Sequence, residues 1–112
     1  MDRKLCVVWV NADPEAALNM AFMYAANGLK KKWWDVVRLV VWGPSAKLLA
    51  EDASLQKEIK AVAEAGVTLL ACKACADRYG VSARLEELGI EVLYVGQPMT
   101  DMLQSDWKVL TV

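Results

Sequence analysis

The feature of this sequence that most constrains its fold is the alternation of short apolar runs with helical patterns. Residues 5–10 (LCVVWV) are all apolar and rich in β-branched side chains, which is typical of a strand buried on both faces. Strands separated by helices pair in parallel, because each helix returns the chain to the starting edge of the sheet. The pattern therefore predicts an α/β fold with helices on both faces of a parallel sheet, whose strands are expected at residues 5–10, 36–42, 67–71, 90–95 and 107–112.

Helices are predicted between those strands. Asp13 followed by Pro14 is typical of an N-cap and the first residue of a helix, which should run to about Lys32. Apolar side chains surround this helix almost completely, which favours burial against a second subunit. Further helices are expected at residues 45–50, 54–65, 72–79, 82–88 and 98–103.

The tryptophans point to the same conclusion about subunits. Trp9 and Trp42 belong to predicted strands and should lie in the core. Trp33 and Trp34 follow the first helix directly, where both rings cannot easily be buried within one chain. A subunit interface explains them best, and ordinary partial burial is the alternative. We therefore expect a homo-oligomer.

Charge and composition exclude several classes of function. The chain has 13 basic and 14 acidic residues, so no basic surface for nucleic acid is expected. Arg3 and Lys4 precede only six apolar residues, which predicts no secretory signal peptide, and no apolar run approaches the roughly 20 residues that span a bilayer. Histidine is absent, which excludes a histidine base or metal ligand. We expect no metal and no cofactor.

Ligands of an open parallel sheet bind beside the carboxyl ends of its strands. Four such ends should share one rim, at residues 11–13, 43–45, 72–75 and 96–99. The second of these segments, residues 43–45 (Gly-Pro-Ser), resembles a phosphate-binding turn only loosely. Helix capping by Ser45 is the simpler explanation. Asn11 likewise fits a turn residue. The binding candidates on this rim are Asn11, Gly43, Pro44, Ser45, Lys73, Gln97 and Met99.

Cys72 and Cys75 carry the sharpest chemical signal. Cys72 follows an apolar strand and should open a helix, whose backbone N–H groups stabilise a thiolate and lower its pKa. Cys75 lies one turn further and could resolve an oxidised Cys72 or pack beneath the helix. The alternative is that both are small buried hydrophobic residues. Cys6 lies in the middle of a strand and should be structural. One C-x-x-C pair among three cysteines favours a reducing, cytoplasmic compartment over a disulfide framework.

Several segments together resemble the DsrE/DsrF-like family of small sulfur-relay proteins. They are residues 69–76 (LLACKACA), 85–92 (LEELGIEV), 98–103 (PMTDML) and 107–111 (WKVLT), with residues 41–49 (VWGPSAKLL) also fitting the pattern. The resemblance covers nearly the whole chain and implies a single three-layer α/β/α domain over residues 1–112, with a five-stranded parallel sheet. It also implies a homotrimer or homohexamer.

The resemblance further implies a function. Cys72 matches the position of the family cysteine that accepts persulfide sulfur and passes it to a partner protein, so sulfur donor and acceptor proteins are the expected partners. Such a carrier cysteine has to be exposed. Cys75 has no counterpart in the family pattern, which leaves two alternatives open: a dithiol redox protein using Cys72 and Cys75, or a non-catalytic binding module with structural cysteines.

Overall fold

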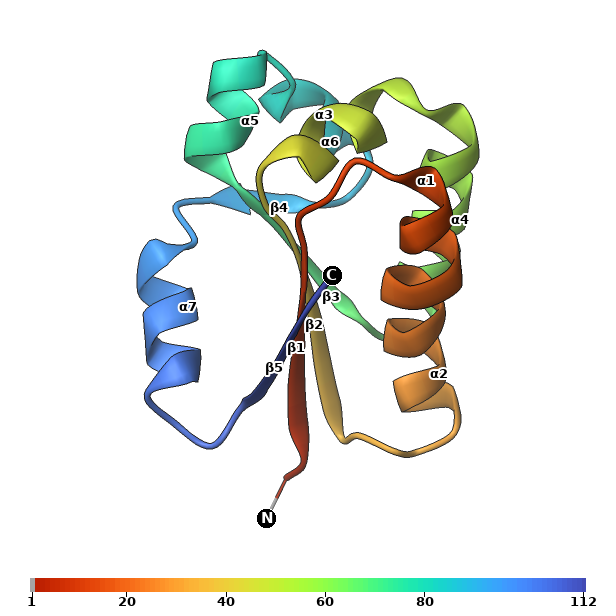
Figure 1. The fold of residues 1–112 in the computed structure, drawn as a ribbon, viewed down its shortest axis with the longest axis vertical. Helices are drawn as coiled ribbons and strands as arrows, with labels where there is room; N and C mark the ends of the chain where they lie inside the picture. Colours follow the sequence, from red (N-terminus) through yellow and green to blue (C-terminus); the bar gives the residue numbers. More distant parts are fainter. Residues whose placement is uncertain (1) are drawn as a thin grey trace.

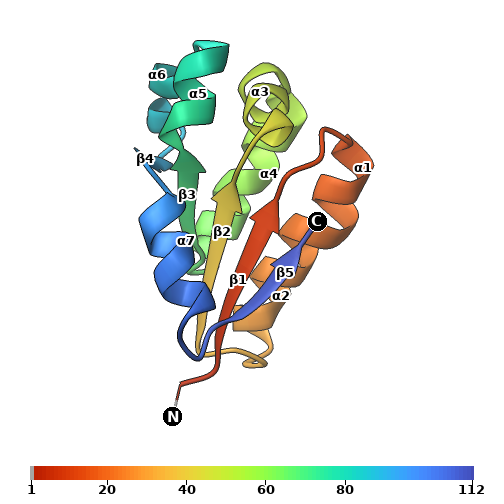
Figure 2. The same ribbon diagram turned by 60° about the vertical axis from the view of Figure 1, so that its left-hand side comes forward.

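The computed structural model describes residues 2–112. The chain contains one five-stranded sheet with helices around it. Its strands all pair in parallel, in the order β4-β3-β2-β1-β5. Figure 2 shows the arrows side by side and pointing to the same edge. The predicted α/β fold with a five-stranded parallel sheet is therefore confirmed. The strands are β1 (Lys4–Trp9), β2 (Val36–Val41), β3 (Thr68–Cys72), β4 (Glu91–Leu93) and β5 (Lys108–Thr111).

Helices cover the two faces of this sheet unequally. Helix α7 stands alone on one face, whereas the others lie on the opposite face or beyond the carboxyl edge (Figure 1). This follows from the topology: the chain steps in one direction from β1 to β4, and only the connection to β5 crosses back. The helices are α1 (Pro14–Ala16), η1 (Ala17–Phe22), α2 (Met23–Lys30), α3 (Pro44–Glu51), α4 (Ala53–Glu64), α5 (Lys73–Tyr79), α6 (Ser82–Glu87) and α7 (Gly96–Leu103).

Alternating strand side chains divide between two hydrophobic cores. In β1, Leu5 and Val7 belong to the larger core beneath α2 and α4, whereas Cys6 and Val8 belong to the smaller core beneath α7. Because a single helix covers the smaller core, the residues at its margin remain partly exposed. They are Val10, Trp42, Cys75, Leu93, Trp107 and Val109.

The first helix begins as predicted and ends slightly earlier. The Asp13 carboxylate accepts a hydrogen bond from the N–H of Glu15 at 2.9 Å, which confirms the expected N-cap. The helical residues end at Lys30 instead of about Lys32, because Lys32 adopts a left-handed conformation with φ of 59°. The middle segment, η1, is π-helical, and such segments are rare in proteins.

Two other boundaries differ from the sequence-based prediction. Strand β4 ends at Leu93 instead of residue 95, and Gly96 begins α7 where it was expected to close the strand. Trp42 lies one residue beyond β2 and is half-buried, whereas Trp9 is fully buried in the larger core as expected. Over residues 2–112, no helix has the length and apolar character needed to cross a membrane.

Candidate functional site

Cys72 lies where a strand gives way to a helix, as the sequence predicts. It is the last residue of β3 and the N-cap of α5. Its backbone is extended, with φ of −68° and ψ of 114°, and its Sγ accepts a hydrogen bond from the backbone N–H of Cys75 at 3.4 Å. The thiol therefore occupies the place that a serine or aspartate side chain takes in most helix caps.

The burial of Cys72 differs from the expectation of an exposed thiol. Its relative exposure is only 6%, and it belongs to the smaller core together with Val95 and Met99. The N-cap residue of α5 belongs to the core that α7 covers, so its thiol lies among apolar side chains instead of in open solvent. The burial of Cys72 could not be predicted from the sequence, because it depends on where α7 crosses the sheet.

The expectation of a low pKa for Cys72 is also wrong. Burial raises the pKa of the Cys72 thiol, since a desolvated thiolate is costly, and a side-chain hydrogen bond with Cys75 raises it further. The backbone N–H groups of Cys75 and Ala74 lower this pKa, as predicted for a helix start, but they do not outweigh the burial. Cys72 is therefore predominantly a neutral thiol at pH 7.

Trp42 is a neighbour of Cys72 that sequence reasoning placed in the core and did not connect with the site. Val41 pairs with Ala71 in the sheet, so Trp42 and Cys72, the next residues along each chain, fall on the same face at the carboxyl edge. Leu93 pairs directly with Cys72 from the other side. Counting residues along the two strands would have placed Trp42 beside Cys72, had the strand order been known.

Cys75 is the more accessible of the two thiol residues. It is half-buried and packs against the margin of the smaller core, whereas Cys72 lies within that core. Both thiols are free. The third thiol, Cys6, is fully buried within β1, and burial raises the pKa of its thiol to about 11. The predicted structural role of Cys6 is consistent with this environment.

Lys73 follows Cys72 directly, but its charge is engaged elsewhere. Its Nζ lies 2.7 Å from the Asp77 carboxylate and 5.8 Å from the centre of the Tyr94 ring. The hydrogen bond and charge of Asp77 raise the pKa of Lys73. The Ser82 hydroxyl donates to the same Asp77 carboxylate. The ammonium group is therefore part of a surface network over α5 and α6.

The remaining rim candidates have structural roles at the ends of neighbouring strands. The Asn11 side chain accepts a hydrogen bond from the N–H of Asp13 at 3.0 Å, as in a turn. Gly43 has φ of 79°, a left-handed conformation that suits glycine, and Pro44 is the first residue of α3. Gln97 is exposed and donates to Asp101 within α7.

Ser45 was expected to cap a helix, and the structure corrects this. It lies inside α3 and is fully buried, and its hydroxyl donates to the backbone oxygen of Trp9 at 2.6 Å. The hydroxyl thereby links the ends of β1 and α3. The structure brings Cys72, Cys75 and Met99 into one cluster, while the Ser45 hydroxyl is engaged by backbone oxygens.

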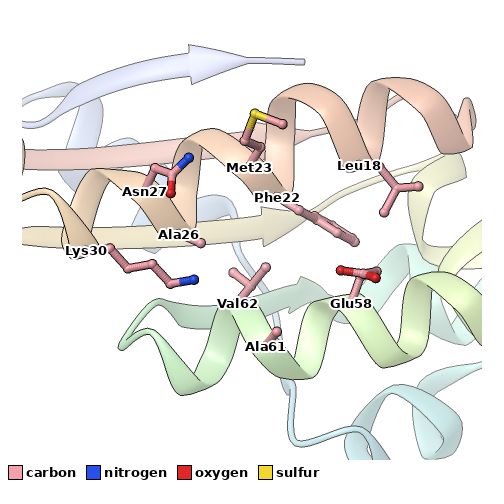
Figure 3. A pocket seen from close by; sticks show the side chains of 9 residues that line it. All are labelled: Leu18, Phe22, Met23, Ala26, Asn27, Lys30, Glu58, Ala61 and Val62. Carbon is pink, nitrogen blue, oxygen red and sulfur yellow. The ribbon is translucent and has the colours of Figure 1, made fainter.

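Surface hollows lie away from this cysteine cluster. One of about 250 Å³ separates α4 from the first helix and is lined by Phe22, Lys30, Glu58 and Val62, among others (Figure 3). A second of about 290 Å³ is lined by Met23 and Trp33, and a third of about 400 Å³ by residues near the amino ends of β1 and β5. Cys72 lines none of these three hollows.

Known proteins with a similar sequence or fold were found for nearly the whole chain. The model of the DsrE/DsrF-like family matches residues 4–112. A conserved protein of unknown function from Bacteroides thetaiotaomicron shares 36% identity with the chain, with a TM-score of 0.94 over 97% of this chain and 94% of that protein. The ychN protein from E. coli has the same fold, with 21% identity and a TM-score of 0.73 over 98% and 99% of the two chains. The search of curated proteins gave no significant match.

Proposed function

Because the chain belongs to the DsrE/DsrF-like family, we propose that it is a sulfur-relay protein that carries persulfide sulfur on Cys72 from a donor protein to an acceptor protein. The observation that carries this proposal is the position of Cys72 at the junction of β3 and α5, with a second thiol residue one turn away. The 36% identity to a protein of the same fold supports the family assignment but assigns no activity, because the function of that protein is unknown.

The relay consists of two thiol-exchange steps. In the first, the Cys72 thiolate attacks the outer sulfur of a donor persulfide, so that Cys72 becomes a persulfide and the donor leaves as a thiolate. In the second, an acceptor thiolate attacks the outer sulfur of the Cys72 persulfide, and Cys72 is released as a thiolate. The electron count of the protein is the same before and after a full cycle, so neither step needs a redox cofactor.

The burial of Cys72 governs how such a relay works. Because burial raises the pKa of Cys72 above the ordinary value of 9.0, no more than about 1% of this thiol is ionised at pH 7, so unassisted loading is slow. The same burial shields a persulfide from small reductants in solution. Donor and acceptor therefore have to approach from the side of Cys75, the more exposed thiol residue.

The three free cysteines suit a reducing compartment, and we propose that the relay works in the cytoplasm.

Self-association is the second part of the proposal. Met20, Met23 and Trp33 are 45%, 51% and 47% exposed, and they lie around one hollow with Tyr24 and Leu110. We name these five residues the α2 surface. Exposed apolar side chains gathered in this way are typical of protein contacts. The α2 surface supports the homotrimer or homohexamer that the family resemblance implies.

The contact between the two cysteines also favours a second candidate function, a dithiol redox protein. The backbone N–H of Cys75 donates to Cys72 Sγ at 3.4 Å, and the Cys75 thiol contributes to the raised pKa of Cys72. In that case a disulfide would form and be reduced in each catalytic cycle without any sulfur being carried. Incubation of Cys75→Ser with a small-molecule persulfide separates this function from the relay, because a purely redox protein would carry no sulfur on Cys72.

Sulfur loading tests the relay proposal directly. Anaerobic incubation of the reduced protein with a small-molecule persulfide should first add one sulfur atom to Cys72, which mass spectrometry of peptides alkylated at early times detects. Loading should persist in Cys6→Ala, because the Cys6 thiol that this variant removes is sealed inside β1. Loading should be lost in Cys72→Ser. Loading of folded Cys72→Ser to the wild-type level would remove the carrier assignment.

A further inference from the structure

We propose that Cys75 discharges a persulfide that stays on Cys72, releasing the carried sulfur as sulfide and closing a Cys72–Cys75 disulfide. This inference rests on the proposed carrier function and adds a second fate for the carried sulfur. Without an acceptor, the protein would reduce sulfane sulfur once per chain and then remain oxidised until a dithiol reductant restored it. A persulfide on Cys72 would therefore have a limited lifetime.

The geometry that carries this inference is the contact between the two cysteines. The backbone N–H of Cys75 donates to Cys72 Sγ at 3.4 Å, and the nearby Cys75 thiol contributes to the raised pKa of Cys72. Residues three apart at a helix start lie within the range of Cα separations that a disulfide bridges. The backbone spacing of these two residues therefore suits a Cys72–Cys75 disulfide.

No other thiol of the chain can take this role. Cys6 is the only remaining cysteine, and it is fully buried in β1. In the sheet Cys6 aligns with Arg38, which aligns with Thr68, four residues before Cys72. At about 3.3 Å per residue this is an offset of about 13 Å along the strands, with a further separation of two strands across the sheet. Cys6 therefore serves as an internal control thiol.

The discharge step balances without an added oxidant. The Cys75 thiolate attacks the inner sulfur of the Cys72 persulfide, a sulfur–sulfur bond forms between the two cysteines, and the bond to the outer sulfur breaks. The outer sulfur leaves as hydrosulfide, HS⁻, carrying the persulfide proton. The outer sulfur gains two electrons, and the two cysteine sulfurs together lose two. Transfer to an acceptor differs only in that the attack falls on the outer sulfur.

Proximity makes the internal attack compete with transfer. Cys75 is held beside the reacting bond, so its attack does not depend on the concentration of a second molecule. An acceptor must dock before Cys75 acts, and a docked acceptor that covers Cys75 would favour transfer. Cys75 is half-buried whereas Cys72 is buried, so a docked acceptor meets Cys75 more readily than Cys72.

The test follows sulfur and thiols in matched variants. Wild-type protein, Cys75→Ser, Cys72→Ser and Cys6→Ala are reduced, desalted anaerobically and treated with inorganic tetrasulfide. They are then desalted again and kept in sealed vessels. Released sulfide is measured by the methylene blue reaction, and peptides are analysed after alkylation. Protein that receives buffer alone controls for adventitious oxidation.

We expect wild-type protein and Cys6→Ala to end with the Cys72–Cys75 disulfide, and their sulfide release to equal the loss of Cys72 persulfide. We expect Cys75→Ser to keep its persulfide and to release less than a tenth as much sulfide. Equal persistence of the persulfide in wild-type protein and Cys75→Ser would overturn the discharge and leave the carrier function standing. Failure of Cys75→Ser to load Cys72 would instead remove the carrier function, and loading of Cys75 in Cys72→Ser would reverse the two roles and overturn both.

Discussion

The thiol of Cys72 caps helix α5 by accepting the backbone N–H of Cys75 at 3.4 Å. A serine hydroxyl fills the same place and is a stronger hydrogen-bond acceptor than a thiol. We therefore predict that Cys72→Ser folds with unchanged or higher stability, while Cys72→Ala loses about 1 kcal/mol of unfolding free energy through loss of the cap. Urea unfolding of the two variants measures this. Equal loss of stability in both would show that the thiol packs without capping.

The reactivity of Cys72 should depend on pH in a way set by its surroundings. Because burial and the Cys75 hydrogen bond raise its pKa, its alkylation rate should still increase by about tenfold per pH unit between pH 7 and 8.5. In Cys75→Ala, where Cys75 no longer raises the pKa of Cys72, this rate profile should shift to lower pH. Iodoacetamide labelling of Cys72, quantified by peptide mass spectrometry, gives both profiles. A profile that levels off below pH 7 would contradict the buried, neutral thiol.

Cys6 should make the fold sensitive to alkali. Its folded pKa of about 11 exceeds the ordinary value of 9.0, so the folded state retains its proton longer than the unfolded chain. The stability that this contributes is complete below about pH 9 and is lost as the pH rises toward 11. Between pH 7.5 and 10.5 the thiol of Cys6 should account for about 2 kcal/mol of the stability lost.

The comparison of wild-type protein with Cys6→Ala isolates that contribution. The variant will be less stable at pH 7.5, because it leaves a small cavity in the smaller core. Its further loss of unfolding free energy toward pH 10.5 should nevertheless be smaller than that of the wild type by about 2 kcal/mol. Identical losses in the two proteins would assign the alkaline sensitivity to other groups.

The α2 surface should hold the oligomer together. Met23 is half-exposed on this surface, and a charge at its position would be buried without a partner in an assembled interface. We predict that Met23→Glu dissociates the oligomer in sedimentation velocity experiments. Leu103→Glu is the control, because Leu103 is 63% exposed on α7, away from the α2 surface. Loss of assembly in the control alone would place the interface on α7.

Local sequence patterns were sufficient to predict the sheet and its helices. The apolar runs marked each strand, and Asp13-Pro14 marked the start of the first helix, because these signals depend only on neighbouring residues. The same reasoning placed Cys72 at the junction of a strand and a helix. The position of a residue along the chain could therefore be predicted.

The surroundings of those residues could not be predicted in the same way. The burial of Cys72 depends on α7 crossing the sheet to reach β5, and the strand order that requires this crossing is a property of the whole fold. Ser45 was expected to cap a helix, yet it lies inside α3 and its hydroxyl donates to the backbone oxygen of Trp9 in β1. Trp42 became a neighbour of Cys72 only through the register of β2 and β3.

The central claim is that the sulfur of residue 72 accepts and holds a persulfide. The most direct measurement is peptide mass spectrometry of Cys75→Ser after anaerobic incubation with a small-molecule persulfide, because this variant cannot discharge the product. The claim predicts a gain of one sulfur atom on Cys72, removed by dithiothreitol and absent from a folded Cys72→Ser/Cys75→Ser double variant. An unmodified Cys72 in folded Cys75→Ser, under conditions that load a reactive thiol in a control peptide, would contradict it.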